Sequence, residues 1–197
     1  MATVVVPFRG SDPKQRLALA DEARRVLADA MLADVAAAAA ALGEVLVVAP
    51  PATRGPAGTT LVDDPRRGQG AAVRAGLDRA VALGLPTPYL VVNADLPCVT
   101  SRDLLALAGA VPDGGLALAP AADGTTNALA LAADDVFRPV YGPGSAGRFA
   151  ALGRSAVVDA PNLADDVDTL ADLARLERRL GPHTRRATAS LDLPSAA

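Results

Sequence analysis

The stretch VVNADLP, residues 91–97, ends an apolar run with an acid and then a proline. The run begins at Tyr89 and reads as a strand that is buried on both faces. Similar apolar runs occur earlier in the chain, separated by segments with helical spacing of apolar residues. Such alternation predicts a largely parallel sheet covered by helices on both faces. Ligands bind such sheets at the carboxyl ends of the strands, so Asp95 is expected at a binding site.

The expected elements give one α/β domain, a three-layer sandwich with a mostly parallel sheet. We expect the domain to span residues 1–181 and the polar residues 182–197 to form a loose tail. Strands are predicted over residues 3–6, 44–49, 59–62, 89–92 and 156–158, with 116–119 and 128–131 able to pair. Helices are predicted over residues 19–42, 68–84, 100–110 and 170–180.

Composition narrows the function classes. The 197 residues carry a net charge of -3, which argues against a nucleic-acid-binding surface but permits a local site for a small anion. One cysteine, Cys98, excludes an internal disulfide and a cysteine-rich zinc site. The single histidine, His183, is expected at the surface. Neither a signal peptide nor a membrane span is recognisable, so we expect a cytoplasmic protein without a membrane partner.

A cluster of acids precedes the last predicted helix. In an extended segment, Asp166 and Asp168 point to one side while Val167 points to the other. Together with Asp95 they would form a site of hard oxygen ligands, of the kind that holds Mg²⁺ beside phosphates. The alternative is that Asp168 or Thr169 only caps the helix.

Three polar loops could bind phosphate. Arg9 and Lys14 follow the first strand in a loop with glycine and proline, which suits a triphosphate. The loop contains no GxxxxGK[ST] motif. Ser145 is predicted to cap a short helix whose N-terminus could bind an anion. Residues 124–127 form a second small turn before a strand. Each of these loops could equally be an ordinary solvated loop.

The motifs VVPFRGSDPKQRLA, NADLP, TTNAL, YGPGS and DDVDT occur in that order. In this order they resemble the 2-phospho-L-lactate guanylyltransferase family of coenzyme F-420 biosynthesis, some members of which use phosphoenolpyruvate. The resemblance covers the chain from Val4 to about Leu180. It implies a single-domain nucleotidyltransferase fold of the GT-A type.

The resemblance also implies roles for individual residues. Arg9 and Lys14 would meet the triphosphate and the acceptor. The remaining roles are Mg²⁺ binding by Asp95, Asp166 and Asp168; acceptor binding by Thr126, Gly144 and Ser145; and framing of the nucleotide by Gly68, Gln69 and Gly70.

The implied reaction joins GMP from GTP to phosphoenolpyruvate or 2-phospho-L-lactate and releases pyrophosphate. The resemblance also implies a downstream transferase as partner, and a homodimer stays open. Two departures leave the nucleotide open: Arg9 stands where the family often has lysine, and Gln69 begins a segment that differs from the usual LNxAL. The alternatives are another GT-A nucleotidyltransferase with a different phosphorylated acceptor, or a non-catalytic nucleotide-binding protein.

Overall fold

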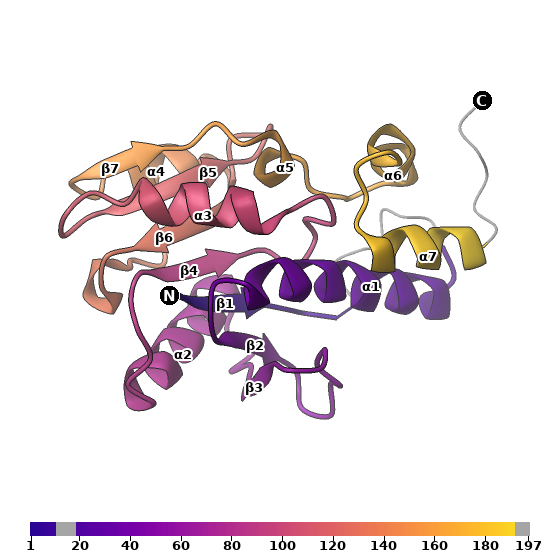
Figure 1. Ribbon diagram of the computed structural model, residues 1–197, viewed down its shortest axis with the longest axis horizontal. Helices are drawn as coiled ribbons and strands as arrows, with labels where there is room; N and C mark the ends of the chain where they lie inside the picture. Colours follow the sequence, from indigo (N-terminus) through magenta and orange to yellow (C-terminus); the bar gives the residue numbers. More distant parts are fainter. Residues whose placement is uncertain (11–18, 192–197) are drawn as a thin grey trace.

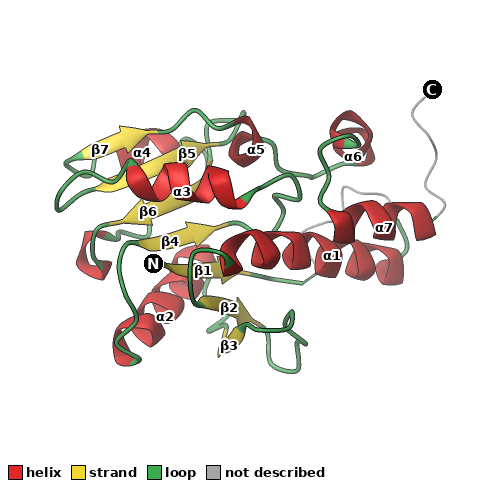
Figure 2. Ribbon diagram, in the orientation of Figure 1, coloured by secondary structure: helices red, strands yellow, loops and turns green. Residues whose placement is uncertain are grey.

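The structure, a computed structural model, describes residues 1–10 and 19–191. The described strands form one seven-stranded sheet in the order β3-β2-β1-β4-β6-β5-β7, with helices on both faces (Figure 1, Figure 2). The elements are β1 (Thr3–Pro7), α1 (Asp21–Ala40), β2 (Val45–Ala49), β3 (Thr60–Asp63), α2 (Gln69–Ala82), β4 (Tyr89–Val92), α3 (Ser101–Gly109), β5 (Leu116–Pro120), β6 (Thr126–Leu131), η2 (Asp134–Val136), α4 (Ser145–Ala150), β7 (Ser155–Val157), α5 (Pro161–Ala164), α6 (Leu170–Leu176) and α7 (Pro182–Ser190).

The sheet is mostly parallel, as the apolar runs predict, with one reversed strand. β3, β2, β1 and β4 run in the same direction, and β7 is parallel to β5. β6 is antiparallel to both of its neighbours, β4 and β5, so the expected pairing of residues 116–119 with 128–131 is confirmed. Because β6 is reversed, its first residues lie at the same edge of the sheet as the carboxyl end of β4.

Side chains alternate between the two faces of the sheet, as strand geometry requires. Val4 and Val6 of β1 pack in a cluster with residues of α1 and α3, whereas Val5 packs on the opposite face with residues of α2. Ala, Val and Leu make up most of both clusters, so the helices pack on the sheet through side chains of modest volume. This is the predicted three-layer arrangement.

The chain after residue 181 differs from the expected loose tail. Pro182–Ser190 is the helix α7, which packs against α1 beyond the carboxyl ends of the central strands (Figure 1). Its first turn is held by Asp34, a residue of α1 that is only 4% exposed. The carboxylate of Asp34 accepts hydrogen bonds from the backbone N–H groups of His183 and Thr184, at 2.9 and 2.8 Å. A side chain 149 residues away therefore orders the start of this helix, and a local sequence pattern cannot predict such a distant contact.

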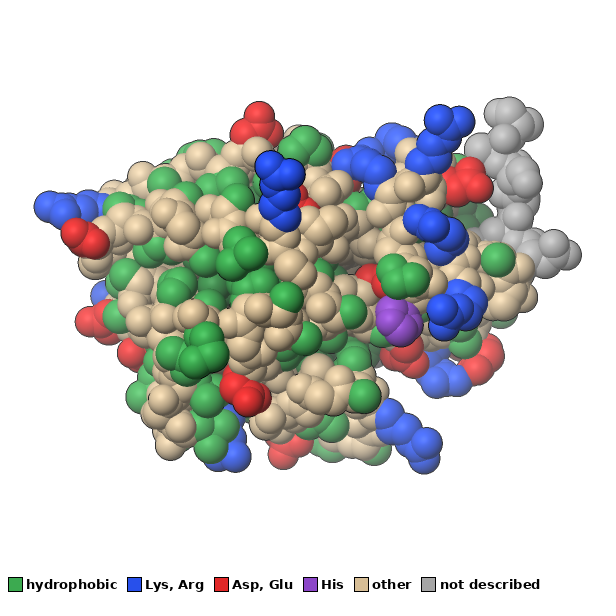
Figure 3. Space-filling view, in the orientation of Figure 1, with side chains coloured by type: hydrophobic (Ala, Val, Ile, Leu, Met, Phe, Trp, Pro, Cys, Tyr) green, Lys and Arg blue, Asp and Glu red, His purple; other side chains and the backbone are tan. Residues whose placement is uncertain are grey.

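The surface carries charges of both signs, interspersed with small polar and apolar residues (Figure 3). The single histidine, His183, is exposed on this surface, as predicted. Within residues 1–10 and 19–191, no helix combines the length and apolar character that crossing a bilayer needs.

Candidate functional site

A cavity of about 180 Å³ lies where β1 and β4 end. It is lined by Arg9 from the loop after β1, Gln69 from the first turn of α2 and Asp95 from the loop after β4. The structure thus brings together one residue from each of three segments that the sequence placed at a site. Lys14 falls outside the described residues, so its predicted role is not addressed.

A second, wider hollow of about 510 Å³ shares Arg9 with the first. Arg25 and Arg54 also line it, together with Asp29. Arg25 is committed to ion pairs with Glu22 and Asp29 on its own helix. The other two arginines that line this hollow, Arg9 and Arg54, take no part in those ion pairs.

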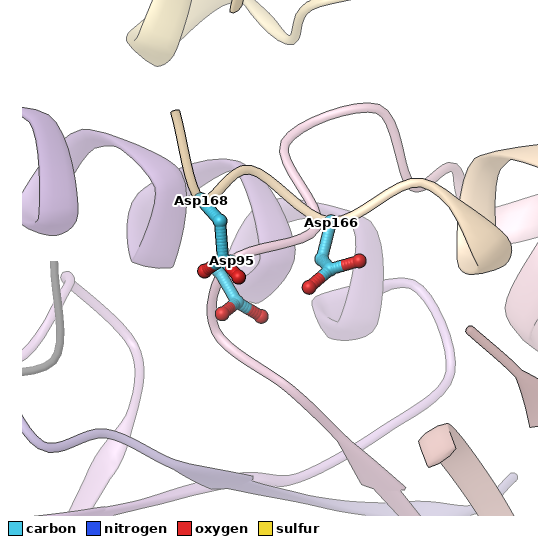
Figure 4. A group of neighbouring side chains, drawn as sticks. All are labelled: Asp95, Asp166 and Asp168. Carbon is cyan, nitrogen blue, oxygen red and sulfur yellow. The ribbon is translucent and has the colours of Figure 1, made fainter. Parts of the chain in front are cut away.

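The three predicted acids converge at the edge of the first cavity. Asp95, Asp166 and Asp168 each offer a carboxylate oxygen, and these three oxygens lie within 4.8 Å of one another (Figure 4). All three residues are partly buried. Converging carboxylates at this spacing fit a hard divalent cation that prefers oxygen ligands.

Val167 explains why the two acids on either side of it face the same way. Its side chain is 0% exposed and packs in an apolar cluster with residues of α1 and α6, among them Met31 and Leu173. Its N–H donates to the backbone carbonyl oxygen of Asp95 at 3.1 Å. Burying this one side chain therefore turns its two neighbours toward the cavity and joins their segment to the loop after β4.

Helix capping does not require the carboxylate of Asp168. The N-cap of α6 is Thr169, whose hydroxyl accepts from the N–H of Asp172 at 3.2 Å, and the Asp172 carboxylate accepts in return from the N–H of Thr169 at 2.9 Å. This reciprocal pair is a complete capping box. Of the alternatives that the sequence left open, Thr169 is thus the cap.

Two adjacent acids stand in opposite electrostatic environments. Burial acts to raise the pKa of Asp165, but hydrogen bonds and charges from Arg179 and Arg175 outweigh it, so its pKa is lowered. For Asp166, burial and then the negative charge of Asp95 raise the pKa. Asp165 is therefore a structural anchor for two arginines, whereas Asp166 sits among like charges that a bound cation would relieve.

Two of the predicted acceptor residues, Thr126 at the start of β6 and Ser145 at the start of α4, come together. The hydroxyls of Thr126 and Ser145 are 3.1 Å apart and both side chains are buried. The N–H of Ala146 donates to the carbonyl oxygen of Gly124 at 3.2 Å and so ties the two turns together. The prediction that Ser145 caps α4 is wrong. The N-cap is Gly144, in the left-handed conformation that glycine tolerates best, and Ser145 is the first helical residue.

Arg148 stabilises the turn that presents these residues. Its guanidinium donates to the carbonyl oxygens of Val140, Tyr141 and Pro143 at 3.0, 3.2 and 2.7 Å. Three carbonyl groups of one turn are thereby bound by one planar cation. Sequence reasoning missed this role, since an exposed arginine in a short helix has no distinguishing pattern.

The segment predicted to frame the nucleotide opens α2, with Gly68 as N-cap and Gly70 in the first turn. Gln69 points toward the loop after β4, and its Nε2 donates to Oδ1 of Asn93 at 2.8 Å. Asn93 in turn contacts Asn127 at the start of β6. Both asparagines were missed as site residues, although each lies at a strand end inside a quoted motif.

The sequence is similar to a known protein family and to several named relatives. The sequence profile described as "MobA-like NTP transferase domain" matches residues 9–179. A phosphoenolpyruvate guanylyltransferase from Sphaerobacter thermophilus is 38% identical over 195 residues, which covers 89% of this chain and 93% of the relative. A 2-phospho-L-lactate guanylyltransferase from Halobacterium salinarum is 38% identical, covering 86% of this chain and 81% of the relative. A 3-phospho-D-glycerate guanylyltransferase from Phenylobacterium zucineum is 33% identical, covering 94% and 93%.

Solved structures with low sequence identity share the fold. A protein assigned as a nucleotide-diphospho-sugar transferase from Desulfovibrio desulfuricans superposes with a TM-score of 0.74 at 17% identity, covering 98% of this chain and 96% of that one. The 2-C-methyl-D-erythritol 4-phosphate cytidylyltransferase of Thermus thermophilus gives a TM-score of 0.62 at 18% identity, covering 90% and 97%. The fold is therefore that of GT-A-like nucleotidyltransferases, as predicted.

Proposed function

Because the chain belongs to the MobA-like NTP transferase family and is a nucleotidyltransferase, we propose that it transfers GMP from GTP to a small phosphorylated carboxylic acid. Phosphoenolpyruvate and 2-phospho-L-lactate are the acceptors we favour, since relatives over most of the chain are named for them. The observation that carries the proposal is the group of three carboxylates beside a cavity that also presents Arg9. Family membership sets aside the non-catalytic alternative.

The proposed reaction needs no general base. A phosphate oxygen of the acceptor, already an anion, attacks the α-phosphorus of GTP. The bond from that phosphorus to the departing diphosphate breaks, and pyrophosphate leaves. In keeping with this, the histidine of the chain lies on the exposed face of α7 rather than at the cavity.

The main task of the protein is then to hold two anions together. Asp95, Asp166 and Asp168 are the residues that would hold Mg²⁺, which, when bound, neutralises charge on the phosphates. Arg9 at the cavity supplies a fixed positive charge for the triphosphate. Lys14 remains a second candidate for that role on the basis of the sequence.

The acceptor is proposed to bind between the two adjoining turns. The hydroxyls of Thr126 and Ser145, buried against each other, would hold the two turns together, and the exposed backbone at Gly144 would offer hydrogen bonds to the phosphate and carboxylate of a small acid. The acceptors named for the relatives share a three-carbon frame but differ in its substituents and in the carbon that carries the phosphate, so we expect the turn that faces that frame to decide among them. The product is expected to pass to a downstream transferase in the biosynthesis of coenzyme F-420.

Pyrophosphate release tests the proposal. The protein is incubated with Mg²⁺ and GTP, with each of phosphoenolpyruvate, 2-phospho-L-lactate and 3-phospho-D-glycerate in turn, and ATP serves as the control nucleotide. We expect release that requires one acid and is much faster with GTP. No release with any of the acids would refute the proposed acceptor class.

Matched variants test whether turnover depends on the three acids of the proposed metal site or on any nearby acidic residue. Asp95→Asn and Asp168→Asn should each lower turnover by about 100-fold or more, because each removes one of the three carboxylates that would hold the cation beside the phosphates. Asp165→Asn removes the neighbouring acid that binds Arg175 and Arg179 instead, and it should keep most of the activity. Near-normal turnover in both of the first two variants would refute the assignment.

A further inference from the structure

A chain of side-chain amides runs from the start of α2 to one of the three acids. Gln69 Nε2 donates to Asn93 Oδ1 at 2.8 Å, and Asn93 Nδ2 donates to Asn127 Oδ1 at 3.3 Å. Asn127 Nδ2 then donates to Asp166 Oδ1 at 3.5 Å. The four residues come from α2, the loop after β4, β6 and the segment before α6, so the amide chain runs from the lining of the cavity, at Gln69 and Asn93, to the group of three acids.

The acid dictates the direction of the whole amide chain. A carboxylate and a backbone carbonyl only accept hydrogen bonds, so the NH₂ group of Asn127 must face Asp166 and the carbonyl oxygen of Ala164, which lies at 3.4 Å. Its Oδ1 is then left for Asn93, whose own NH₂ group also donates to the carbonyl oxygen of Thr126 at 3.4 Å. Each amide group in turn fixes the next, as far as Gln69.

The backbone holds the middle of the amide chain in place. Val92 lies opposite Ala128 in the antiparallel pairing of β4 with β6, so Asn93 and Asn127 are the next pair of opposed residues. The N–H of Asn93 donates to the carbonyl oxygen of Asn127 at 3.0 Å. Asn127 is only 2% exposed, and a buried amide that lost these partners would be costly, so its orientation is strongly determined.

We propose that Asn127 and Asn93 are positioning residues that hold Asp166 in the metal-binding group and, through the same amide chain, fix the amide of Gln69 at the cavity. The identity of the cation rests on the proposed function. Outer hydrogen-bond partners of ligating groups typically contribute 10- to 100-fold to metal affinity. A ligand in the cavity consequently meets a glutamine that is held in one orientation whenever Asp166 is correctly placed.

The test measures binding of Mn²⁺ alone, by isothermal titration calorimetry, without nucleotide or acceptor. We expect Asn127→Leu to weaken Mn²⁺ binding at least 10-fold. Thr184→Val is the matched control, because Thr184 is equally buried but lies in α7 and its hydroxyl makes no hydrogen bond among the described residues. It should bind Mn²⁺ within about twofold of the wild type.

A double variant tests whether the amides act as one chain. If Gln69 acts through the two asparagines, Gln69→Leu combined with Asn127→Leu should bind Mn²⁺ no more weakly than Asn127→Leu alone. Multiplication of the two single effects would overturn the coupling, and Asn127→Leu within twofold of the wild type would overturn the positioning role. Urea denaturation of each variant checks the fold, and Asn93→Leu replaces Asn127→Leu if that variant does not fold.

The outcome is separable from that of the proposed reaction. Loss of pyrophosphate release with all three acids, combined with the expected Mn²⁺ results, would refute the acceptor class and leave the amide chain intact. A wild-type protein that binds no Mn²⁺ would overturn the inference itself, since Asp166 would then have no metal to ligate.

Discussion

The joint between α1 and α7 offers a sharp test of how the C-terminal segment is held. Asp34→Ala removes the carboxylate that accepts from the N–H groups of His183 and Thr184. Residue 182 is a proline without an N–H, and the N–H of Arg185 bonds to the carbonyl oxygen of Gly181 at 3.0 Å. The carboxylate therefore satisfies the two remaining donors of the first turn, which would otherwise be left without partners.

The size of the effect follows from these contacts. Loss of an N-capping side chain costs about 0.5–2 kcal/mol, and loss of a negative charge at a partly buried helix N-terminus costs up to about 2 kcal/mol more. We therefore expect Asp34→Ala to lower the free energy of unfolding by about 2–3 kcal/mol. That is a large share of the roughly 5–15 kcal/mol that a domain of this kind has.

Urea denaturation followed by circular dichroism measures the change. Asp34→Asn keeps one acceptor oxygen, so its loss should be about half as large. Gly181→Ala disturbs the same joint from the other side, because a Cβ at Gly181 would lie 2.3 Å from Cγ of Asp34. A stability of Asp34→Ala within about 0.5 kcal/mol of the wild type, the range of an inconsequential surface change, would refute this account of α7.

Three further results are expected. Burial and then the charge of Asp95 raise the pKa of Asp166, so ionisation of this carboxylate lowers the stability of the metal-free protein as pH rises through that pKa. With a chelator present, Asp166→Asn should therefore resist urea better than the wild type at neutral pH but not at about pH 3. The stability of this variant should not respond to Mn²⁺. Equal urea resistance at both pH values would contradict this. Ser145→Ala should raise the KM for the acceptor acid at least several-fold and leave the KM for GTP nearly unchanged, which steady-state kinetics would show; equal shifts in both would argue against an acceptor site there. Arg148→Ala should raise the acceptor KM in the same way, because the turn loses the cation that binds three of its carbonyl groups, whereas an unchanged acceptor KM would show that the turn holds its shape without it.

Much of the fold could be predicted because it rests on local patterns. Continuous apolar runs predicted the strands of the parallel half, and the helix predicted over residues 100–110 matches α3, which Thr100 and Asp103 cap with a capping box. The reversal of β6 between β4 and β5 is a matter of pairing between distant segments, which apolar content alone does not specify. The sequence therefore predicted the layers and the sheet type better than the order of its strands.

The site, too, has features that local sequence predicts and features that depend on contacts between distant segments. The alternation of Asp166, Val167 and Asp168 is local and was readable, and the structure brings both acids beside Asp95. The amide chain depends on which residues of β4 and β6 lie opposite each other, so Asn93 and Asn127 could be recognised only once the register was known. The capping of α7 by Asp34 joins residues 149 positions apart, and for that reason the helix was mistaken for a loose tail.

The reversed direction of β6 has an evolutionary consequence. Because this strand enters the sheet from the side where β1 and β4 leave it, the turn before Thr126 is built by a different part of the chain from the loops that carry Arg9 and Asp95. Insertions and substitutions in that turn, and in its neighbour before Ser145, can accumulate as long as Asn127, which follows Thr126 and contacts Asp166, keeps its place. If the acceptor binds at these turns, as we propose, a lineage can exchange one three-carbon acid for another while its nucleotide chemistry stays as it was, and the variety of acceptors named among the relatives would follow.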